Sequence, residues 1–172
     1  MAPLEVHMRA VVIGLALALV SGSVAAQQPA PSAAQALKTF ASSADVAALA
    51  AKAKADRKEG QALVAQSILR LAPYNVSLEY RTAVANAAVH ETEAELFLVI
   101  DGSATIVTGG KLTEEKRTNA ENLSGSGIQN GKSQHIAKGD FVMVPEGTPH
   151  WFSAIDGTIT LMSLHLPHAP AK

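Results

Sequence analysis

Short apolar runs separated by closely spaced turn signals are the feature that most restricts how this chain can fold. Asp101-Gly102 lies between two apolar runs, and Asp156-Gly157 lies between two others. Asp-Gly pairs in this setting are a strong short-range signal for a β-hairpin. Gly109-Gly110 and Asn130-Gly131 mark two further turns. Many short strands with regular turns predict an all-β sandwich or barrel.

The side-chain pattern between these turns predicts individual strands. Val76, Leu78 and Tyr80 alternate with polar neighbours, as in a half-buried strand. Leu96–Ile100 is apolar without alternation, as expected for a strand that is covered on both faces. The polar segment Lys111–Ser133 is interpreted as an excursion at the rim of the barrel. The β region is predicted over residues 61–167, followed by a short tail over residues 168–172.

The N-terminal residues 1–26 have the pattern of a signal peptide. Ala10–Val20 is an apolar run, and the small residues that follow it suit cleavage before Gln27. The alternative is a transmembrane anchor, for which the run is short. Met8 is an alternative start that gives a tidier basic region. The chain has no cysteine, so it has neither disulfides nor a lipid-attachment thiol. We expect a periplasmic or secreted protein without a stable membrane anchor after cleavage.

A flexible leader over residues 27–41 and an N-terminal helix over residues 42–60 are predicted next. Ser42 and Asp45 have the spacing of a capping box, and Gly60 marks the helix end. Four apolar residues share one face of this helix: Val46, Leu49, Ala50 and Ala53. The helix is expected to pack across the barrel, and a partner-binding role is the alternative.

Charge and composition exclude several classes of function. The formal net charge is −1, which does not indicate binding to nucleic acid or to an acidic membrane surface. The sequence has no cysteine, no Gly-x-Ser-x-Gly nucleophile motif and no glycine loop that would hold a phosphate. Any functional site in this protein is therefore expected to use other residue types.

Two stretches about fifty residues apart carry residue types that bind metals. His90 and Glu95 can act together if residues 91–94 form the loop between two strands. His150 follows a rigid turn that contains Pro145 and Pro149. Two histidines and one carboxylate form the facial triad that is typical of non-haem iron(II), and manganese, zinc, nickel and copper are alternatives. His90, Glu95 and His150 are therefore the candidate ligands of one divalent transition metal.

These two stretches resemble the two signature motifs of the cupins. In the first motif, Glu95 and Gly102 keep the family's spacing, and His90 takes the position of the second histidine. The position of the first histidine is Ala88, which cannot bind a metal. The second motif is matched from Gly139 to His150. The resemblance implies a cupin jelly-roll β-barrel with an N-terminal α-helix, and a metal site inside it.

The departure at Ala88 leaves two interpretations open. Three protein ligands are chemically sufficient and leave room for water or substrate, whereas the alternative is a degenerate site without metal. A two-residue turn at Asp156-Gly157 would pair His150 with Ser163 and make His165 a diagonal neighbour of His150. His165 is then an extra ligand or a hydrogen-bond donor to a ligand. The alternative is a histidine that only closes the end of the barrel.

Three functions are compatible with this site, and the sequence does not distinguish an enzyme from a non-catalytic binding protein. The first is a metal-dependent protein acting on a small oxygen-bearing molecule, for example as a dioxygenase or an isomerase. The second is a non-catalytic cupin that binds a small ligand and has a degenerate metal site. The third is a structural or interaction role in which an edge of the barrel forms a homodimer.

Overall fold

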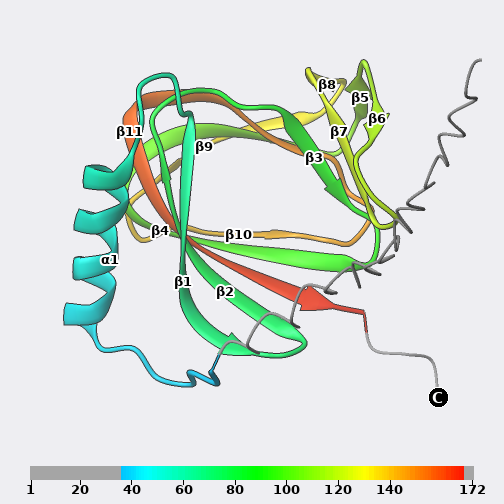
Figure 1. Cartoon of the computed structure of the whole chain (residues 1–172). Helices are drawn as coiled ribbons and strands as arrows, with labels where there is room; N and C mark the ends of the chain where they lie inside the picture. Colours follow the sequence, from blue (N-terminus) through cyan, green and yellow to red (C-terminus); the bar gives the residue numbers. More distant parts are fainter. Residues whose placement is uncertain (1–35, 169–172) are drawn as a thin grey trace, which may run out of the picture. The chain divides into compact units, whose positions relative to one another are not determined.

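Residues 36–168 are described by the computed structural model and form one α-helix and eleven β-strands (Figure 1). The predicted signal peptide 1–26, most of the leader 27–41 and the tail residues 169–172 lie outside the described residues. The prediction of an all-β fold with an N-terminal helix is confirmed. The elements are α1 (Ser43–Asp56), β1 (Leu63–Leu71), β2 (Tyr74–Arg81), β3 (Ala87–His90), β4 (Glu93–Thr108), β5 (Lys111–Thr113), β6 (Lys116–Arg117), β7 (Asn122–Gly125), β8 (Gly127–Gln129), β9 (Lys132–Ala137), β10 (Phe141–Val144) and β11 (His150–Pro167).

The two longest strands, β4 and β11, pair with each other along almost their whole length. Their antiparallel register begins at His150 opposite Thr108 and ends at Pro167 opposite Glu93. Each strand continues through its Asp-Gly pair, so the hairpins predicted at Asp101-Gly102 and Asp156-Gly157 are wrong. These turn signals lie inside strands rather than between them.

Both Asp-Gly pairs form a corner at which the β4–β11 ladder bends. The register shifts here, because the segment between Ile155 and Ile159 is longer than the segment of β4 opposite it. Gly102 has φ +80°, and a Cβ on it would lie 2.1 Å from the carbonyl oxygen of Thr158, so only glycine fits. Figure 1 shows β11 curving from orange to red around one side of the barrel, so both of its ends return to the same side.

The corner also changes the partner of His150. The predicted pairing with Ser163 is wrong, because His150 lies opposite Ala88 of β3 and Ser163 lies opposite Phe97 of β4. His165 nevertheless reaches the carboxylate that His150 also contacts, because the Nε2 atoms of both lie within 3.3 Å of a Glu95 oxygen. The bent ladder brings its two ends together, whereas a hairpin would have paired them directly.

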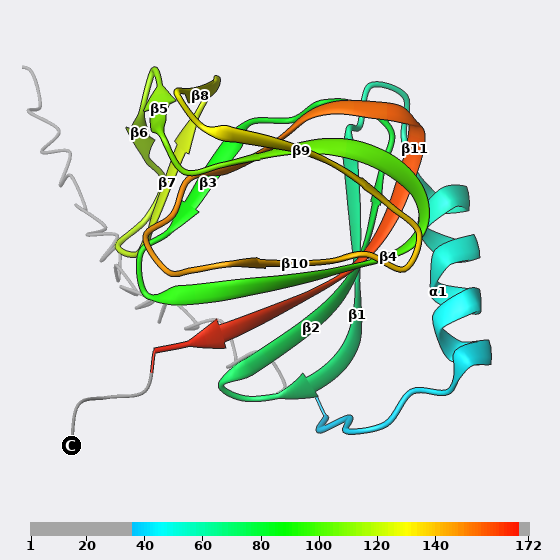
Figure 2. The same ribbon diagram turned by 180° about the vertical axis from the view of Figure 1, so that it is seen from behind.

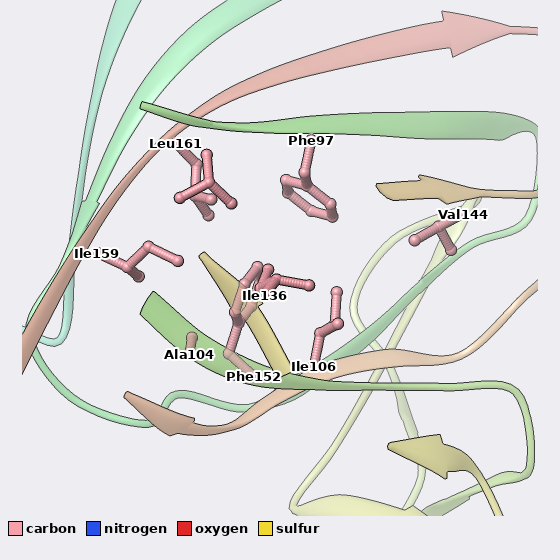
Figure 3. Packing of buried hydrophobic residues seen from close by; sticks show 9 residues of the cluster. Phe97, Ala104, Ile106, Ile136, Val144, Phe152, Ile159 and Leu161 are labelled. Atoms are coloured by element: carbon pink, nitrogen blue, oxygen red, sulfur yellow. The ribbon is translucent and has the colours of Figure 1, made fainter. Parts of the chain in front are cut away.

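The bent ladder encloses an apolar core (Figure 3). Alternate residues of β4 and β11 point inward, and strands β9 and β10 close the core. Burying each aliphatic or aromatic side chain contributes roughly 1.5–3 kcal/mol. The buried cluster consists of Phe97, Val99, Ala104, Ile106, Ile136, Val144, Phe152, Ile159 and Leu161.

Helix α1 packs against the outside of β1 and β2, as Figure 2 shows from behind. The predicted capping box is confirmed, because the Asp45 amide donates to Ser42 Oγ at 3.1 Å and the Ser42 amide donates to Asp45 Oδ2 at 2.8 Å. Ala53 is fully buried against these strands. The helix ends at Asp56, earlier than predicted, because Arg57 adopts an extended conformation. No helix within residues 36–168 has both the length and the hydropathy needed to cross a membrane.

The polar segment Lys111–Ser133 contains four short strands. The turns predicted at Gly109-Gly110 and Asn130-Gly131 are confirmed, since β4 ends before the first pair and β9 begins after the second. β5 and β8 form a separate two-stranded sheet, whereas β6 and β7 extend the main sheet beside β3. Asn122 of β7 lies opposite His90 of β3 as a result.

Candidate metal centre

Three strands place the candidate ligands at one end of the barrel. His90 is the last residue of β3, and Glu95 is near the start of β4, with only Glu91 and Thr92 between the two strands. His150 is the first residue of β11, and His165 is close to its end. The ladder corner therefore supplies two histidines from a single strand, fifteen positions apart in the sequence.

The carboxylate of Glu95 is the centre of the cluster. Its Oε2 atom lies 3.4 Å from Nε2 of His90 and 3.1 Å from Nε2 of His150, and its Oε1 atom lies 3.3 Å from Nε2 of His165. The ring of His90 lies 5.2 Å from that of His150 and 4.8 Å from that of His165. The structure thus brings together the three residues predicted as ligands and places His165 beside them.

Glu95 is buried and one of its oxygens is left without a hydrogen bond. The residue is only 3% exposed. Oε1 accepts a hydrogen bond from Ser163 Oγ at 2.5 Å, but Oε2 has no hydrogen-bond partner. A buried polar atom without a partner is costly and rare in folded proteins. This oxygen therefore needs either a proton donor or a cation.

The other ring nitrogen of each histidine faces an acceptor. Nδ1 of His165 lies 2.9 Å from Glu93 Oε2, and Nδ1 of His150 lies 3.4 Å from the carbonyl oxygen of Thr148. Nδ1 of His90 lies 2.5 Å from Asn122 Oδ1. Because these oxygens accept hydrogen bonds, Nδ1 carries the proton in each ring. In the neutral form, each Nε2 then presents a lone pair toward Glu95.

Electrostatics in the cluster favour ionised Glu95. Burial opposes ionisation of Glu95, but the neighbouring imidazoles of His150, His165 and His90 outweigh it when they are protonated and hold the pKa of Glu95 far below its usual range. The contact with Glu95 raises the pKa of His165 to about 9, against the opposing effect of burial, and Glu93 adds to the rise. The same carboxylate is the main cause of the raised pKa of His90. The cluster is therefore a concentrated site for positive charge.

The donor set fits a divalent transition metal. Ligand atoms of His90, Glu95 and His165 lie within 4.8 Å of one another. Two ligands about 2.1 Å from one metal and at right angles to each other lie about 3 Å apart. The contacts between Glu95 and the three Nε2 atoms are close to that value. A cation held by His90, Glu95 and His165 would neutralise the buried carboxylate, and Asn122 and Glu93 would orient the rings of His90 and His165. His150 lies beside this group through its 3.1 Å contact with Glu95 Oε2.

Residues outside the predicted ligand set complete the cluster. Ser163 lies two positions before His165, so strand periodicity places both on one face of β11. Asn122 carries no such local signal, because only long-range pairing of β7 with β3 brings it to His90. His135 and His168 are exposed and are not in contact with Glu95: His135 contacts Asp156, and His168 contacts Glu146 and donates its amide to Thr92.

Comparisons with known proteins give fold matches of low sequence identity. HppE in its iron(II) form is 17% identical with a TM-score of 0.49, and the match covers 64% of this chain and 54% of that chain. KdgF from Halomonas sp. is 13% identical with a TM-score of 0.48, and the match covers 66% and 87% of the two chains. A cupin superfamily protein from Desulfitobacterium hafniense is 14% identical with a TM-score of 0.45, covering 65% and 83%. This chain thus spans about half the length of HppE.

The family comparison gives a direct assignment. No curated protein sequence gives a significant match. The model of the family described as Cupin, however, matches residues 60–167, which is most of the described barrel. This range contains the Glu95 cluster and the corner that assembles it. The fold and the family match agree with the resemblance of the two motifs, and the chain belongs to the cupin family.

Proposed function

We propose that this protein holds one divalent transition metal in its barrel and uses it to act on a small oxygen-bearing molecule. His90, Glu95 and His150 are the proposed ligands, and His165 is an additional ligand to the same ion. Iron, manganese, zinc, nickel and copper all suit this mixture of imidazole and carboxylate. The reaction class would be that of a dioxygenase or an isomerase.

One observation carries this proposal. The buried Oε2 atom of Glu95 has no hydrogen-bond partner, and Nε2 atoms of two histidines lie within 3.4 Å of it. A purely structural carboxylate would be expected to accept hydrogen bonds from fixed donors. Imidazole nitrogens converging on a buried carboxylate oxygen form an ion-binding site once the rings are in their neutral form, because each Nε2 then presents a lone pair that a metal can take up.

We infer that a substrate would approach this centre along β3 and β7. Ala88 shares a face with His90, Ser124 lies opposite Ala88, and Lys116 of β6 lies opposite Ser124. A bound metal would supply Lewis acidity or, in the case of iron, oxygen activation. Polar side chains would orient a substrate through its hydroxyl or carboxylate groups. A pocket of about 260 Å³ next to these strands is lined by Asn86, Glu114, Lys116, Thr118, Ser124, Gly125 and Ser126, and none of the residues around Glu95 is part of this lining.

Export of the protein is part of this proposal. The apolar run Ala10–Val20 and the small residues after it support cleavage of a signal peptide before Gln27. Metal loading would then take place in the periplasm or outside the cell, and the partner would be a small molecule.

Metal analysis of protein purified without an affinity tag tests the proposal. We expect close to one metal ion per chain, and we expect His90→Ala and His150→Ala to lose it. His135→Ala is the matched control, because His135 is exposed and distant from Glu95, and it should keep the metal. Wild-type protein that stays metal-free after incubation with iron, manganese, zinc, nickel and copper would contradict the proposal.

Turnover separates an enzyme from a metal-binding carrier. Metal-loaded protein is mixed with a panel of small hydroxy acids, diketones and sugars, and oxygen consumption and product formation are recorded. Activity lost in His90→Ala and retained in His135→Ala supports an enzyme. Metal-dependent ligand binding without turnover supports the non-catalytic alternative.

A further inference from the structure

A chain of hydrogen bonds leads from the β6–β7 connection, residues 118–121, to the ring of His90. It starts at the backbone amide of Glu121, which donates to Asn119 Oδ1 at 2.9 Å. Asn122 Nδ2 donates to the same oxygen at 3.0 Å. Asn122 Oδ1 then lies 2.5 Å from His90 Nδ1. Two side-chain amides therefore connect a backbone N–H to a proposed metal ligand.

Each hydrogen bond in this chain fixes the direction of the next. A backbone N–H can only donate, so the Asn119 atom that faces the Glu121 amide is the side-chain oxygen. That oxygen can only accept, so Asn122 turns its NH₂ group toward Asn119 and its own oxygen toward His90. An amide oxygen has no proton to give, and Nδ1 of His90 must carry one. In a neutral ring, Nε2 then has a free lone pair, 3.4 Å from Glu95 Oε2.

The carboxylate of Glu95 favours the opposite tautomer. Its Oε2 atom has no hydrogen-bond partner among residues 36–168, and a proton on Nε2 of His90 would supply one. That tautomer could not bind a metal through Nε2, because a ring nitrogen binds a metal only when it is unprotonated. It would become stable if the Asn122 amide turned over and presented its NH₂ group to Nδ1. The direction of the Asn122 amide therefore decides which nitrogen of His90 is available.

Arg117 holds the β6–β7 connection in the geometry that these hydrogen bonds require. Its guanidinium contacts both carboxylate oxygens of Glu91, at 2.6 and 3.0 Å. Nη1 also donates to the carbonyl oxygens of Asn119 at 3.3 Å and Ala120 at 3.1 Å. The Glu91 amide donates to the carbonyl oxygen of Glu121 at 2.8 Å. Glu91 is the first residue after β3, so these contacts tie the connection to the strand that carries the ligand.

We propose that Asn119 is a positioning residue for the metal centre, which fixes the direction of the Asn122 amide and thereby keeps Nε2 of His90 free for a metal. This role rests on the proposed function, because it matters for metal binding only if His90 is a ligand. The hydrogen bonds themselves involve no ion. The tautomer of His90 can therefore be measured in metal-free protein, independently of metal binding.

Nitrogen-15 NMR of the histidine side chains in metal-free protein tests this role, because protonated and unprotonated ring nitrogens resonate at well-separated frequencies. At alkaline pH, where the ring is neutral, His90 of the wild type should carry its proton on Nδ1. Asn119→Ala removes the acceptor and should shift the neutral ring mainly to the form with the proton on Nε2. Asn119→Asp should restore the wild-type pattern, because a carboxylate accepts both hydrogen bonds. The spectrum of His90→Gln identifies the signals.

Thr118→Val is the matched control in the same connection. It removes the 3.1 Å hydrogen bond from Thr118 Oγ1 to the backbone carbonyl of Asn122, but it leaves the side-chain amide of Asn122 paired with Asn119. The tautomer of His90 should stay as in the wild type. A shift as large as that of Asn119→Ala would show that general loosening of the connection is the cause, and it would overturn the proposal.

Zinc titration gives a second readout, which depends on the proposed function. Asn119→Ala should weaken zinc binding by about 10-fold or more, as for other outer partners of metal ligands, and Asn119→Asp should recover most of the loss. Zinc binding by Asn119→Ala that is as tight as in wild type would overturn the positioning role.

Two NMR results overturn the proposal whether or not zinc binds. These are a wild-type His90 whose neutral ring carries its proton on Nε2, and an Asn119→Ala variant that keeps the proton on Nδ1. A wild type that binds no zinc but shows the change of tautomer in Asn119→Ala would contradict the proposed function and still support the control of His90 by Asn119.

Discussion

Ala88 and His165 determine which histidines surround Glu95. Ala88 stands where the first cupin motif has a histidine, and it lies opposite His150. His165 comes from the far end of β11 and places its Nε2 3.3 Å from the same carboxylate. The imidazole that is missing at position 88 of β3 is thus supplied by His165 of β11. The two histidines and the glutamate of the motifs could be predicted from local spacing, whereas the contact of His165 depends on how the barrel closes.

Substitutions at these two positions test whether they are interchangeable. His165→Ala should weaken metal binding by at least about 10–100-fold, the range seen even for outer partners of metal ligands. Ala88→His in the His165→Ala background should recover much of this loss, because residue 88 shares a face with His90. Calorimetric titration of metal-free protein with zinc measures both effects.

Two outcomes would contradict this account of the ligand set. The first is zinc binding by His165→Ala that is as tight as in wild type, which would show that His165 only closes the end of the barrel. The second is zinc binding by the double variant that is no tighter than in His165→Ala. In that case a ring at position 88 does not reach the ion.

At the scale of elements, the corner in the β4–β11 ladder determines the position of the site. The sequence predicts hairpins at both Asp-Gly pairs, which is wrong, although Gly102 and Gly157 do have the positive φ values of +80° and +76° that turn residues often adopt. Whether the chain reverses there or bends within a strand depends on partners distant in sequence. A glycine with a positive φ occurs both in hairpin turns and at bends within a strand. The local sequence therefore could not distinguish a hairpin from a corner.

The steric crowding at this corner should be visible in the free energy of unfolding. Gly102→Ala should lower the free energy of unfolding by roughly 3 kcal/mol, because its Cβ would collide with the Thr158 carbonyl in addition to the backbone strain. Gly157→Ala is the matched control, since its φ is also positive but no atom lies within 4 Å of the added Cβ. It should cost about 1 kcal/mol. Urea unfolding followed by circular dichroism measures both, and equal effects would mean that the corner is not sterically constrained.

At the scale of the whole molecule, the barrel has a polar end and an apolar outer surface. β4 contributes to both, because Glu95 faces inward whereas Leu96, Leu98 and Ile100 face outward. The all-β class, the N-terminal helix and the family were predicted from the sequence, since strand pattern, capping box and motif spacing are local. The strands within Lys111–Ser133 were not predicted, because short polar strands gain their stability from neighbours rather than from their own pattern.

Anomalous X-ray diffraction at the absorption edge of the bound metal is the most direct test of the central claim. We expect one strong peak per chain, at roughly 2.0–2.2 Å from a Glu95 oxygen and from the Nε2 atoms of His90 and His150, with His165 Nε2 as a further ligand. A crystal grown with metal that shows no peak at Glu95, or a peak only beside exposed His135 or His168, would contradict the claim.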